Sequence, residues 1–511
     1  MKITIENSYT RVVKATGEET DWLFSFLAFD DVQAEQKERM GFGKRYGKRK
    51  RDTKIRLYDR KAMRFPTGLL PILLAGAERR GFAVQTVDGR GSPHATFTEL
   101  ADAPFGMSGK WSFQLKALEA WAAGGDGNLV EKPLPFRGIV KSTTGSGKGR
   151  IAVASARAVE GHTLFMVHRG HLAIDVRDRW DSLCTPLGEP HAGFIGDGEW
   201  REGERLTCAT LQTLHRNRNI ERYAKLVESV TSVVVDECHT APAESFYATI
   251  QDFDNARTRL GLSGTPYDRG DKRSLIAVAA LGPMVYKIGA RQLIDLGVLS
   301  EPKIVVVPCW QEVDPRFRGD WNPTYRELVV ESLHRNGLIL ACMQKALADG
   351  DTSGMVFVRR VGHARELVKH AEKLGLNCAY VDGSKDSKQR QDALRRLEAG
   401  RLDFIVATKV FAEGVNIPEL RCVINGAGGK SVIEVLQQVG RGTRTTETKS
   451  SFVVYEVGDK GDPIMHKHAR ARVAACQREG YRCEVDTTIW PEAIDKARLA
   501  AYFARSLLEA I

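Results

Sequence analysis

The feature that most constrains this sequence is a glycine-rich stretch, KSTTGSGKGR, at Lys141–Arg150. A short apolar run, Gly138–Val140, precedes it, and an Ala/Val-rich run with helical spacing, Ile151–Val159, follows it. A strand, a glycine loop and a helix in this order are the context in which phosphate-binding loops occur. The glycines allow a tight turn whose backbone N–H groups surround phosphate oxygens, and the helix adds the positive end of its dipole.

Within this stretch, Lys148 supplies a point charge for the β- and γ-phosphates of a nucleotide. Gly149 departs from the usual pattern, because Ser or Thr normally follows the lysine and binds Mg²⁺ through its hydroxyl. Another hydroxyl of the loop or a water molecule could take that place. The alternative interpretation is an ordinary glycine-rich turn between a strand and a helix. The residues expected around the nucleotide are Thr144, Gly145, Ser146, Gly147, Lys148 and Gly149.

The composition indicates how many domains the chain has, what kind of partner it binds and in which cell compartment it lies. With 511 residues the chain is too long for one core, so we expect two to four domains. The net charge of +11 indicates an anionic partner, most commonly nucleic acid, and a merely soluble basic protein is the alternative. The nine cysteines include no CxxC pair, which favours reduced thiols over structural zinc. Because there is neither an apolar signal core nor a bilayer-spanning run, we expect a cytoplasmic protein, or a nuclear one in a eukaryote.

An acidic pair, Asp236 and Glu237, directly follows the β-branched run Ser232–Val235, which is typical of a central parallel strand. Strand-like and helical runs alternate around it, which predicts a parallel α/β sheet with the pair at its carboxyl edge, where ligands bind. Asp236 is then expected to hold Mg²⁺ through water, and Glu237 to act as the general base that polarises the attacking water. The alternative is a helix cap, the more frequent role of acidic residues after a strand.

The first 105 residues are expected to form a small α+β domain, in which Lys2–Ile5 alternates like a strand. Their most basic stretch, KRYGKRKR at Lys44–Arg51, has six cations in eight residues, a density that phosphates would neutralise. Tyr46 within it could stack on bases. The alternatives are a solvated loop or a nuclear import signal. The expected nucleic-acid contacts are Lys44, Arg45, Lys48, Arg49, Lys50 and Arg51.

A composition rich in Gly, Pro and Ala at Gly91–Ser108 predicts a linker after this domain. Gln114 then follows two aromatic residues shortly before the glycine loop, and its amide could both donate to and accept from adenine, although a surface glutamine is the usual interpretation.

A second alternating α/β segment starts near Leu299. Its predicted strands are Ile304–Val307, Gly354–Val358, Asn377–Val381, Phe404–Ala407 and Cys422–Asn425. The expected domains are 1–105, 106–297 and 298–462, followed by a short C-terminal extension, 463–511.

The order of these motifs resembles that of a superfamily 2 helicase over about residues 105–460. The glycine loop is similar to motif I, and Asp236–His239 reads DECH, a motif II of the DEAD/DEAH type. Further similarities to motifs Ia, Ib, III, V and VI lie at Leu164–Leu172 (LFMVHRGHL), Thr207–Leu214 (TCATLQTL), Leu262–Pro266 (LSGTP), Val406–Pro418 (VATKVFAEGVNIP) and Gln437–Arg444 (QQVGRGTR). Seven similarities in the family's order are far more specific than any one of them.

The resemblance implies two tandem RecA-like lobes, each a parallel sheet, which bind ATP and Mg²⁺ and hydrolyse ATP between them. Motif VI arginines act in this family as fingers that stabilise transition-state charge, an effect worth about 10³–10⁵ in rate. Further implied residues are Gln437, Arg441 and Arg444 for catalysis, Gly414 and Gln114 for the nucleotide, Arg169, Thr210, Gln212 and Thr408 for nucleic acid, and His239, Ser263 and Thr265 for coupling the two sites.

Within the superfamily, the DECH box and the small N-terminal domain resemble the UvsW-like helicases of phages. The resemblance implies a monomeric ATP-dependent DNA helicase or translocase on duplex, single-stranded or branched DNA, active in junction migration, fork remodelling, recombination or repair. An RNA helicase of the same fold is one alternative, because such lobes mostly grip the backbone. A hydrolysis-impaired clamp or annealing protein is another, and Gly149 motivates it.

Overall fold

The computed structural model describes residues 1–30, 54–91, 93–125, 128–267, 273–311, 314, 320–351, 353–382, 387–408, 420–429, 431, 440 and 451–489. The chain divides into two compact units, of which the first contains Met1–Thr143 and Gly147–Ile288 and the second continues from Gly289. Each unit has its own sheets and cores. Within the described ranges, no helix combines the length and apolar character that a bilayer crossing requires.

The N-terminal part of the first unit is a small α+β domain, as predicted. Its elements are β1 (Lys2–Ile5), β2 (Tyr9–Lys14), α1 (Gly17–Phe26), β3 (Ala28–Asp30), β4 (Lys54–Arg56), β5 (Arg64–Pro66), η1 (Thr67–Leu69), α3 (Leu70–Arg80) and β6 (Gln85–Asp88). The main sheet has the order β5-β2-β1-β6, and β3 pairs with β4 separately. Helix α1 begins at a capping box, in which Thr16 and Glu19 satisfy each other's backbone N–H groups.

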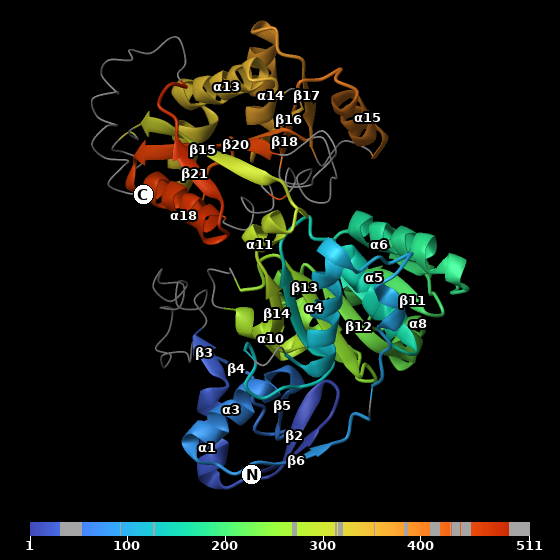
Figure 1. Ribbon diagram of the computed structural model, residues 1–511. Helices are drawn as coiled ribbons and strands as arrows, with labels where there is room; N and C mark the ends of the chain where they lie inside the picture. Colours follow the sequence, from blue (N-terminus) through green and yellow to red (C-terminus); the bar gives the residue numbers. More distant parts are fainter. Residues whose placement is uncertain are drawn as a thin grey trace. The chain divides into compact units, whose positions relative to one another are not determined.

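The first lobe is a three-layer α/β structure with an eight-stranded sheet (Figure 1). Its strands are β7 (Arg137–Ser142), β8 (His162–Val167), β9 (Gly193–Gly196), β10 (Glu199–Arg201), β11 (Leu206–Thr210), β12 (Val230–Asp236), β13 (Thr258–Ser263) and β14 (Met284–Ile288). Its helices are α4 (Ser112–Ala123), α5 (Lys148–Ala158), α6 (Gly170–Leu183), α7 (Leu211–Arg216), α8 (Glu221–Ser229), α9 (Glu244–Asp252) and α10 (Ser274–Leu281). The order is β10-β9-β11-β8-β12-β13-β7-β14, parallel except for the edge pair β9–β10. Helices α4 to α6 pack on one face, and α7 to α10 on the other.

The segment Gly91–Ser108 is not the linker that its composition predicts. Leu100, Phe105 and Met107 are at most 1% exposed and belong to the core beneath α4, α5 and α6. The N–H of Thr96 also donates to the carbonyl at the end of α5. The prediction was wrong because glycine and proline only form the turns here, while a few apolar side chains fix the segment to the lobe.

The N-terminal domain and the first lobe share a buried polar contact and an apolar core. The fully buried Arg259 on β13 donates to the hydroxyl of Ser8 and, at 2.6 Å, to Oε1 of Gln251. Arg137 on β7 donates to the carbonyl of Asn7. The shared core includes Leu69, Leu70 and Leu73 of the domain and Leu134, Val278 and Ala279 of the lobe. Because buried guanidinium groups need hydrogen-bond partners, the domain completes the lobe on which it packs.

Gly68 fixes how closely the N-terminal domain approaches the lobe, because a Cβ there would lie 2.1 Å from the carbonyl oxygen of Val278 on α10. We expect Gly68→Ala to separate the two surfaces and to destabilise the first unit by about 1–3 kcal/mol. The control is Gly17→Ala in α1, where a Cβ has no neighbour within 4 Å. Urea unfolding and limited proteolysis measure the effect, and equal stability of the two variants would contradict it.

His162 gives the first lobe a specific sensitivity to acid. Its ring nitrogens lie 2.8 Å from the hydroxyl of Thr207 and 3.0 Å from that of Ser229. Burial, with the charge of Arg205, lowers the pKa of His162 to about 4. The unfolded chain, where the pKa is about 6.5, therefore takes up the proton first, and stability is lost as pH falls from about 6.5 toward 4.

This loss is expected to reach about 2–3 kcal/mol at pH 4.5. His162→Gln, which can still hydrogen-bond to both hydroxyls, should lose correspondingly less stability between pH 7 and pH 4.5 in urea unfolding. His94→Gln, at an exposed position, is the matched control. An identical pH dependence of the His162 variant and the unaltered protein would refute the prediction.

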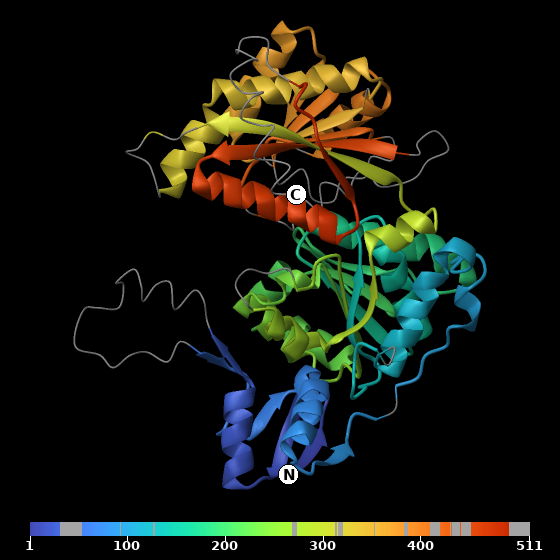
Figure 2. The same cartoon turned by 60° about the vertical axis from the view of Figure 1, so that its left-hand side comes forward.

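The second unit is a lobe built on a seven-stranded parallel sheet. Its strands are β15 (Glu301–Gln311), β16 (Gly354–Val358), β17 (Cys378–Val381), β18 (Phe404–Thr408), β19 (Cys422–Asn425), β20 (Ser451–Gly461) and β21 (Arg482–Val485). Its helical elements are α11 (Ala290–Asp295), α12 (Trp321–Tyr325), η7 (Arg326–Val330), α13 (Leu333–Ala348), α14 (Val361–Lys373), α15 (Ser387–Glu398) and α18 (Pro463–Arg478). The order is β17-β18-β16-β19-β20-β15-β21. Figures 1 and 2 show α13 and α18 on opposite faces of this sheet, in agreement with their separate cores.

All five strands predicted for this lobe are confirmed, but β20 was not predicted. Its buried positions include Glu456 and Asp459, and such polar residues do not fit the apolar pattern of a central strand. The segment 463–511, predicted as a C-terminal extension, supplies α18 and the strand β21, which pairs with β15. The rest of this segment, after residue 489, lies outside the described residues.

A buried network of charged side chains accounts for the polar residues of β20. Arg472 on α18 donates to Oε1 of Glu456 at 2.6 Å, and Asn425 donates to Oε2 of the same carboxylate at 2.7 Å. Arg335 on α13 pairs with Asp459, whose Oδ2 lies 3.5 Å from Arg472. Burial raises the pKa of Glu456 despite these partners. The network links helices on both faces of the sheet to the interior strand β20.

Candidate nucleotide-binding site

The glycine loop joins β7 to α5, so the strand–loop–helix context predicted from the sequence is confirmed. Gly145 and Gly147 have φ angles of +91° and +84°, which side chains rarely adopt. Gly147 is required for a second reason, because a Cβ there would lie 2.5 Å from Nε2 of Gln114. The buried Gln114 of α4 is thus held against the loop, where the sequence placed an adenine contact.

The acidic pair meets the loop lysine at the carboxyl edge of the sheet. Strand β13 lies between β7 and β12, and all three are parallel, so Lys148 and the end of β12 come to the same edge. Nζ of Lys148 lies 3.7 Å from Oε1 of Glu237, and Nδ1 of His239 lies 3.2 Å from Oε2. Glu237 has a φ of +48°, a strained conformation for a residue other than glycine, which is typical of functional sites.

The two adjacent carboxylates have opposite pKa shifts. Burial, together with the charge of Glu237, raises the pKa of Asp236. Burial acts in the same direction on Glu237, but the Lys148 ammonium and His239 outweigh it and lower the pKa of that carboxyl. Glu237 is therefore ionised at neutral pH, as a general base must be before it accepts a proton.

The residues at this edge fit Mg²⁺ together with a bound nucleotide. Oδ1 of Asp236 accepts the backbone N–H of Glu237 at 2.8 Å, which fixes the carboxylate at the end of β12. Mg²⁺ in nucleotide sites commonly uses one or two carboxylates, substrate phosphates and several waters. The described part of the chain has no cluster of three His, Cys, Asp or Glu residues that could hold a metal without a ligand. Asp236 is the side chain that fits this role, and Gly149 contributes no hydroxyl.

The predicted coupling residues form a chain of contacts beside this pair. Nδ1 of His239 lies 3.3 Å from Oγ of Ser263, and the N–H of Thr265 donates to the same oxygen at 3.1 Å. Ser263 is the last residue of β13, between the loop strand and the acidic strand. A shift of Glu237 can therefore reach the turn that follows β13 through two hydrogen bonds.

The predicted nucleic-acid contacts of the first lobe lie at the ends of two paired strands. Arg169 follows β8 and precedes α6, and Thr210 ends β11 and precedes α7. Gln212 joins the two ends, because its Nε2 donates to the carbonyl of His168 at 2.9 Å. Thr408, in the other lobe, is the last residue of β18. These residues occupy the carboxyl edges of their sheets, where the motif order predicts them.

Several predicted site residues lie outside the described residues, and their roles stay predictions. They are Lys44, Arg45, Lys48, Arg49, Lys50, Arg51, Gly414, Gln437, Arg441 and Arg444.

Two arginines beside the loop were not predicted as site residues. Arg150 directly follows Gly149, and its guanidinium carbon lies 5.5 Å from the centre of the Trp111 ring. Arg179 comes from α6 and approaches the same turn of α5. The sequence carried a weak signal for Arg150, because it is the last residue of the basic, glycine-rich stretch Lys141–Arg150. It carried none for Arg179, because helix packing alone brings that residue to the loop.

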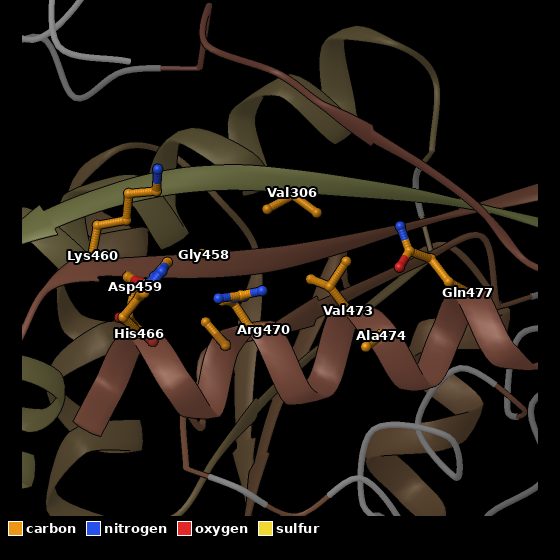
Figure 3. A pocket seen from close by; sticks show the side chains of 10 residues that line it. Val306, Gly458, Asp459, Lys460, His466, Arg470, Val473, Ala474 and Gln477 are labelled. Carbon is orange, nitrogen blue, oxygen red and sulfur yellow. Dashed lines mark hydrogen bonds between the residues drawn. The ribbon is translucent and has the colours of Figure 1, made fainter. Parts of the chain in front are cut away.

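The second lobe contains a cavity of about 240 Å³ between α18 and the strands β15 and β20. Figure 3 shows Arg470 and Val473 extending from α18 toward the sheet, opposite Val306 of β15. The cavity borders Gly458 of β20, where a Cβ would lie 2.8 Å from Val306. None of the site residues predicted from the sequence lines it.

Two family models match this chain. The model described as type III restriction enzyme, res subunit, matches residues 111–268, which include the glycine loop and the DECH box. The model described as helicase conserved C-terminal domain matches residues 338–446, which include the segments similar to motifs V and VI. With the two-lobed fold and the motif order, these matches show that the chain belongs to the superfamily 2 helicases.

Individual relatives agree with this assignment. The ATP-dependent DNA helicase uvsW of Enterobacteria phage T4 is 24% identical over 339 residues, which are 63% of this chain and 65% of that protein. The DNA 3'-5' translocase XPB2 of Sulfurisphaera tokodaii is 25% identical over 388 residues, which are 68% of this chain and 81% of that protein. Three curated relatives, uvsW among them, are matched over only 55% to 65% of their own length.

A solved structure confirms the fold class. S. cerevisiae Dbp5 bound to RNA and ADP BeF3 superposes with a TM-score of 0.51 at 13% identity, over 81% of this chain and 100% of that chain. At this identity the likeness concerns the fold alone. The prediction of two tandem RecA-like lobes with a small α+β domain before them is confirmed.

Proposed function

We propose that this chain hydrolyses ATP and uses the energy to move along or unwind DNA, with duplex or branched DNA as its substrate. The observation that carries the proposal is the convergence of Lys148, Glu237 and His239 beside the glycine loop. It places a cation for the β- and γ-phosphates and an ionised base for water at the same sheet edge.

In the structure Lys148 neutralises Glu237, and each of these groups has a different task once a nucleotide binds. The triphosphate draws the Lys148 ammonium, which leaves Glu237 free to orient water, with His239 still beside it. Asp236 is the residue that would hold Mg²⁺, whose contribution when bound is to neutralise charge on the β- and γ-phosphates. Arg441 and Arg444 are proposed to add the arginine fingers that this chemistry needs.

The nucleic-acid path is proposed to follow Arg169, Thr210 and Gln212 in the first lobe and Thr408 in the second. The hydrogen bond between Gln212 and the His168 carbonyl holds the ends of β8 and β11 in a fixed arrangement, at which successive phosphates could bind.

DNA is favoured over RNA because uvsW and XPB2 are a DNA helicase and a DNA translocase by name. The basic stretch Lys44–Arg51 is proposed as a further DNA contact. We propose that the protein acts in junction migration, fork remodelling, recombination or repair. Its proposed active form is a cytoplasmic monomer with bound ATP and Mg²⁺.

ATP turnover in the presence of single-stranded, duplex, forked and four-way DNA, and of matched RNA, tests the proposal. We expect DNA to stimulate turnover, most strongly when it is duplex or branched. Stronger stimulation by RNA would favour the RNA helicase alternative. Binding of nucleic acid without any turnover would favour the clamp or annealing alternative, which the missing hydroxyl at Gly149 suggests.

A further inference from the structure

We propose that Arg150 and Arg179 form a second cationic contact for the nucleotide, at its α-phosphate, in a site where Gly149 supplies no hydroxyl for Mg²⁺. The inference rests on the proposed function, because it takes the glycine loop to be a nucleotide site. It assigns two specificity-determining residues to that site. Neither belongs to the loop motif in the form shared by nucleotide-binding loops.

Arg179 lies beside the position that the missing side chain would occupy. A Cβ on Gly149 would lie 3.4 Å from Nε of Arg179 and 3.7 Å from a methyl group of Val176, both on α6. The first turn of α5 therefore has an approaching guanidinium where related loops have a hydroxyl.

Arg150 brings a second positive charge to the same turn. It is half-buried and lies against the ring of Trp111. Burial, with the charge of Arg179, lowers the pKa of Arg150, so the two guanidinium groups repel each other. Within the described part of the chain, neither guanidinium forms an ion pair with a carboxylate. Arg179 is exposed, so water screens part of this repulsion, and an anionic ligand beside both groups would offset the rest.

The position along the loop identifies which part of the nucleotide would supply the anion. Lys148 serves the β- and γ-phosphates, and the N–H groups of the next residues in the first helical turn face the phosphates closer to the sugar. Gln114, the proposed adenine contact, is the third residue of α4 and lies about one helical turn after Trp111. Arg150, against Trp111 and two residues after Lys148, is therefore inferred to contact the α-phosphate. The ligand class is an adenine nucleotide with at least one phosphate.

Titration of the full chain with fluorescently labelled ADP and with AMP, each with Mg²⁺ and with EDTA, tests the inference. Arg150→Gln and Arg179→Gln are each expected to weaken ADP and AMP by a similar factor, about tenfold, because both ligands carry the α-phosphate. Lys148→Ala should weaken ADP much more than AMP, since AMP has no β-phosphate. Adding EDTA should reduce the ADP affinity of the double variant Arg150→Gln/Arg179→Gln more than that of the unaltered protein. The variant in EDTA has neither Mg²⁺ nor the two arginines to neutralise the phosphates.

The controls separate this inference from the proposed function. Lys225→Gln removes an exposed cation on α8 and should leave binding unchanged. Arg179→Lys should keep most of the affinity if charge is what matters. If the unaltered chain binds no ADP, or binds it equally well with Lys148→Ala, the proposed function fails. If Lys148→Ala abolishes ADP binding while both folded arginine variants bind ADP and AMP within about twofold of the unaltered chain, the function stands and this inference is wrong.

Discussion

Glu237→Gln is expected to reduce ATP turnover by about 10²–10⁴ while ADP binds almost as before. The amide keeps the size and the hydrogen bond to His239 but cannot accept a proton from water. Lys148→Ala should reduce turnover at least as much and should weaken ADP as well, because the β-phosphate loses its cation. Without that ammonium, the pKa of Glu237 also rises, since Lys148 is the strongest influence that lowers it.

Turnover with saturating DNA and ADP titration together measure both effects. Lys225→Gln, which removes a charge of the same type from the surface of the same lobe, is the control and should retain full turnover. A rate above half of the unaltered one in either site variant would show that Lys148 and Glu237 are not the catalytic pair. Loss of ADP binding in Glu237→Gln would instead assign that carboxylate to ligand binding.

Arg472→Met is expected to destabilise the second lobe by about 3–5 kcal/mol, the usual cost of removing one partner of a buried ion pair. Arg472 is 1% exposed and donates to Glu456 and to the carbonyls of Gly429 and Val457. Methionine fills a similar volume but leaves the carboxylate of Glu456, whose pKa burial already raises, without its main counter-charge. The free energy lost is therefore electrostatic rather than a cavity effect.

Arg470→Met on the same helix is the matched control, because Arg470 is exposed and borders the cavity of Figure 3. Its effect in urea unfolding should stay within about 0.5 kcal/mol. The double variant Arg472→Met/Glu456→Gln should recover part of the loss, because the uncompensated charge is gone. Equal stabilities of the two single variants would mean that the buried network contributes nothing.

The candidate site shows which parts of a structure a sequence pattern can predict. The glycine loop and the acidic pair were predictable, because phosphate binding demands particular residues at fixed spacing within a strand–loop–helix unit. The parallel sheet followed from alternating runs, and it brought Lys148 and Glu237 together as expected. The strand β20 escaped prediction, because its Glu456 and Asp459 are buried against arginines that lie elsewhere in the chain.

By itself, the sequence determined the two-lobed α/β architecture and the chemistry of the loop, since both depend on local periodicity and on short motifs. Only the tertiary structure decided that 91–108 packs as core, that the N-terminal domain completes the first lobe through Arg259, and that Arg179 faces Gly149. These are contacts between segments far apart in the chain. They depend on shape and on the partnering of buried charge, for which no spacing rule exists in one dimension.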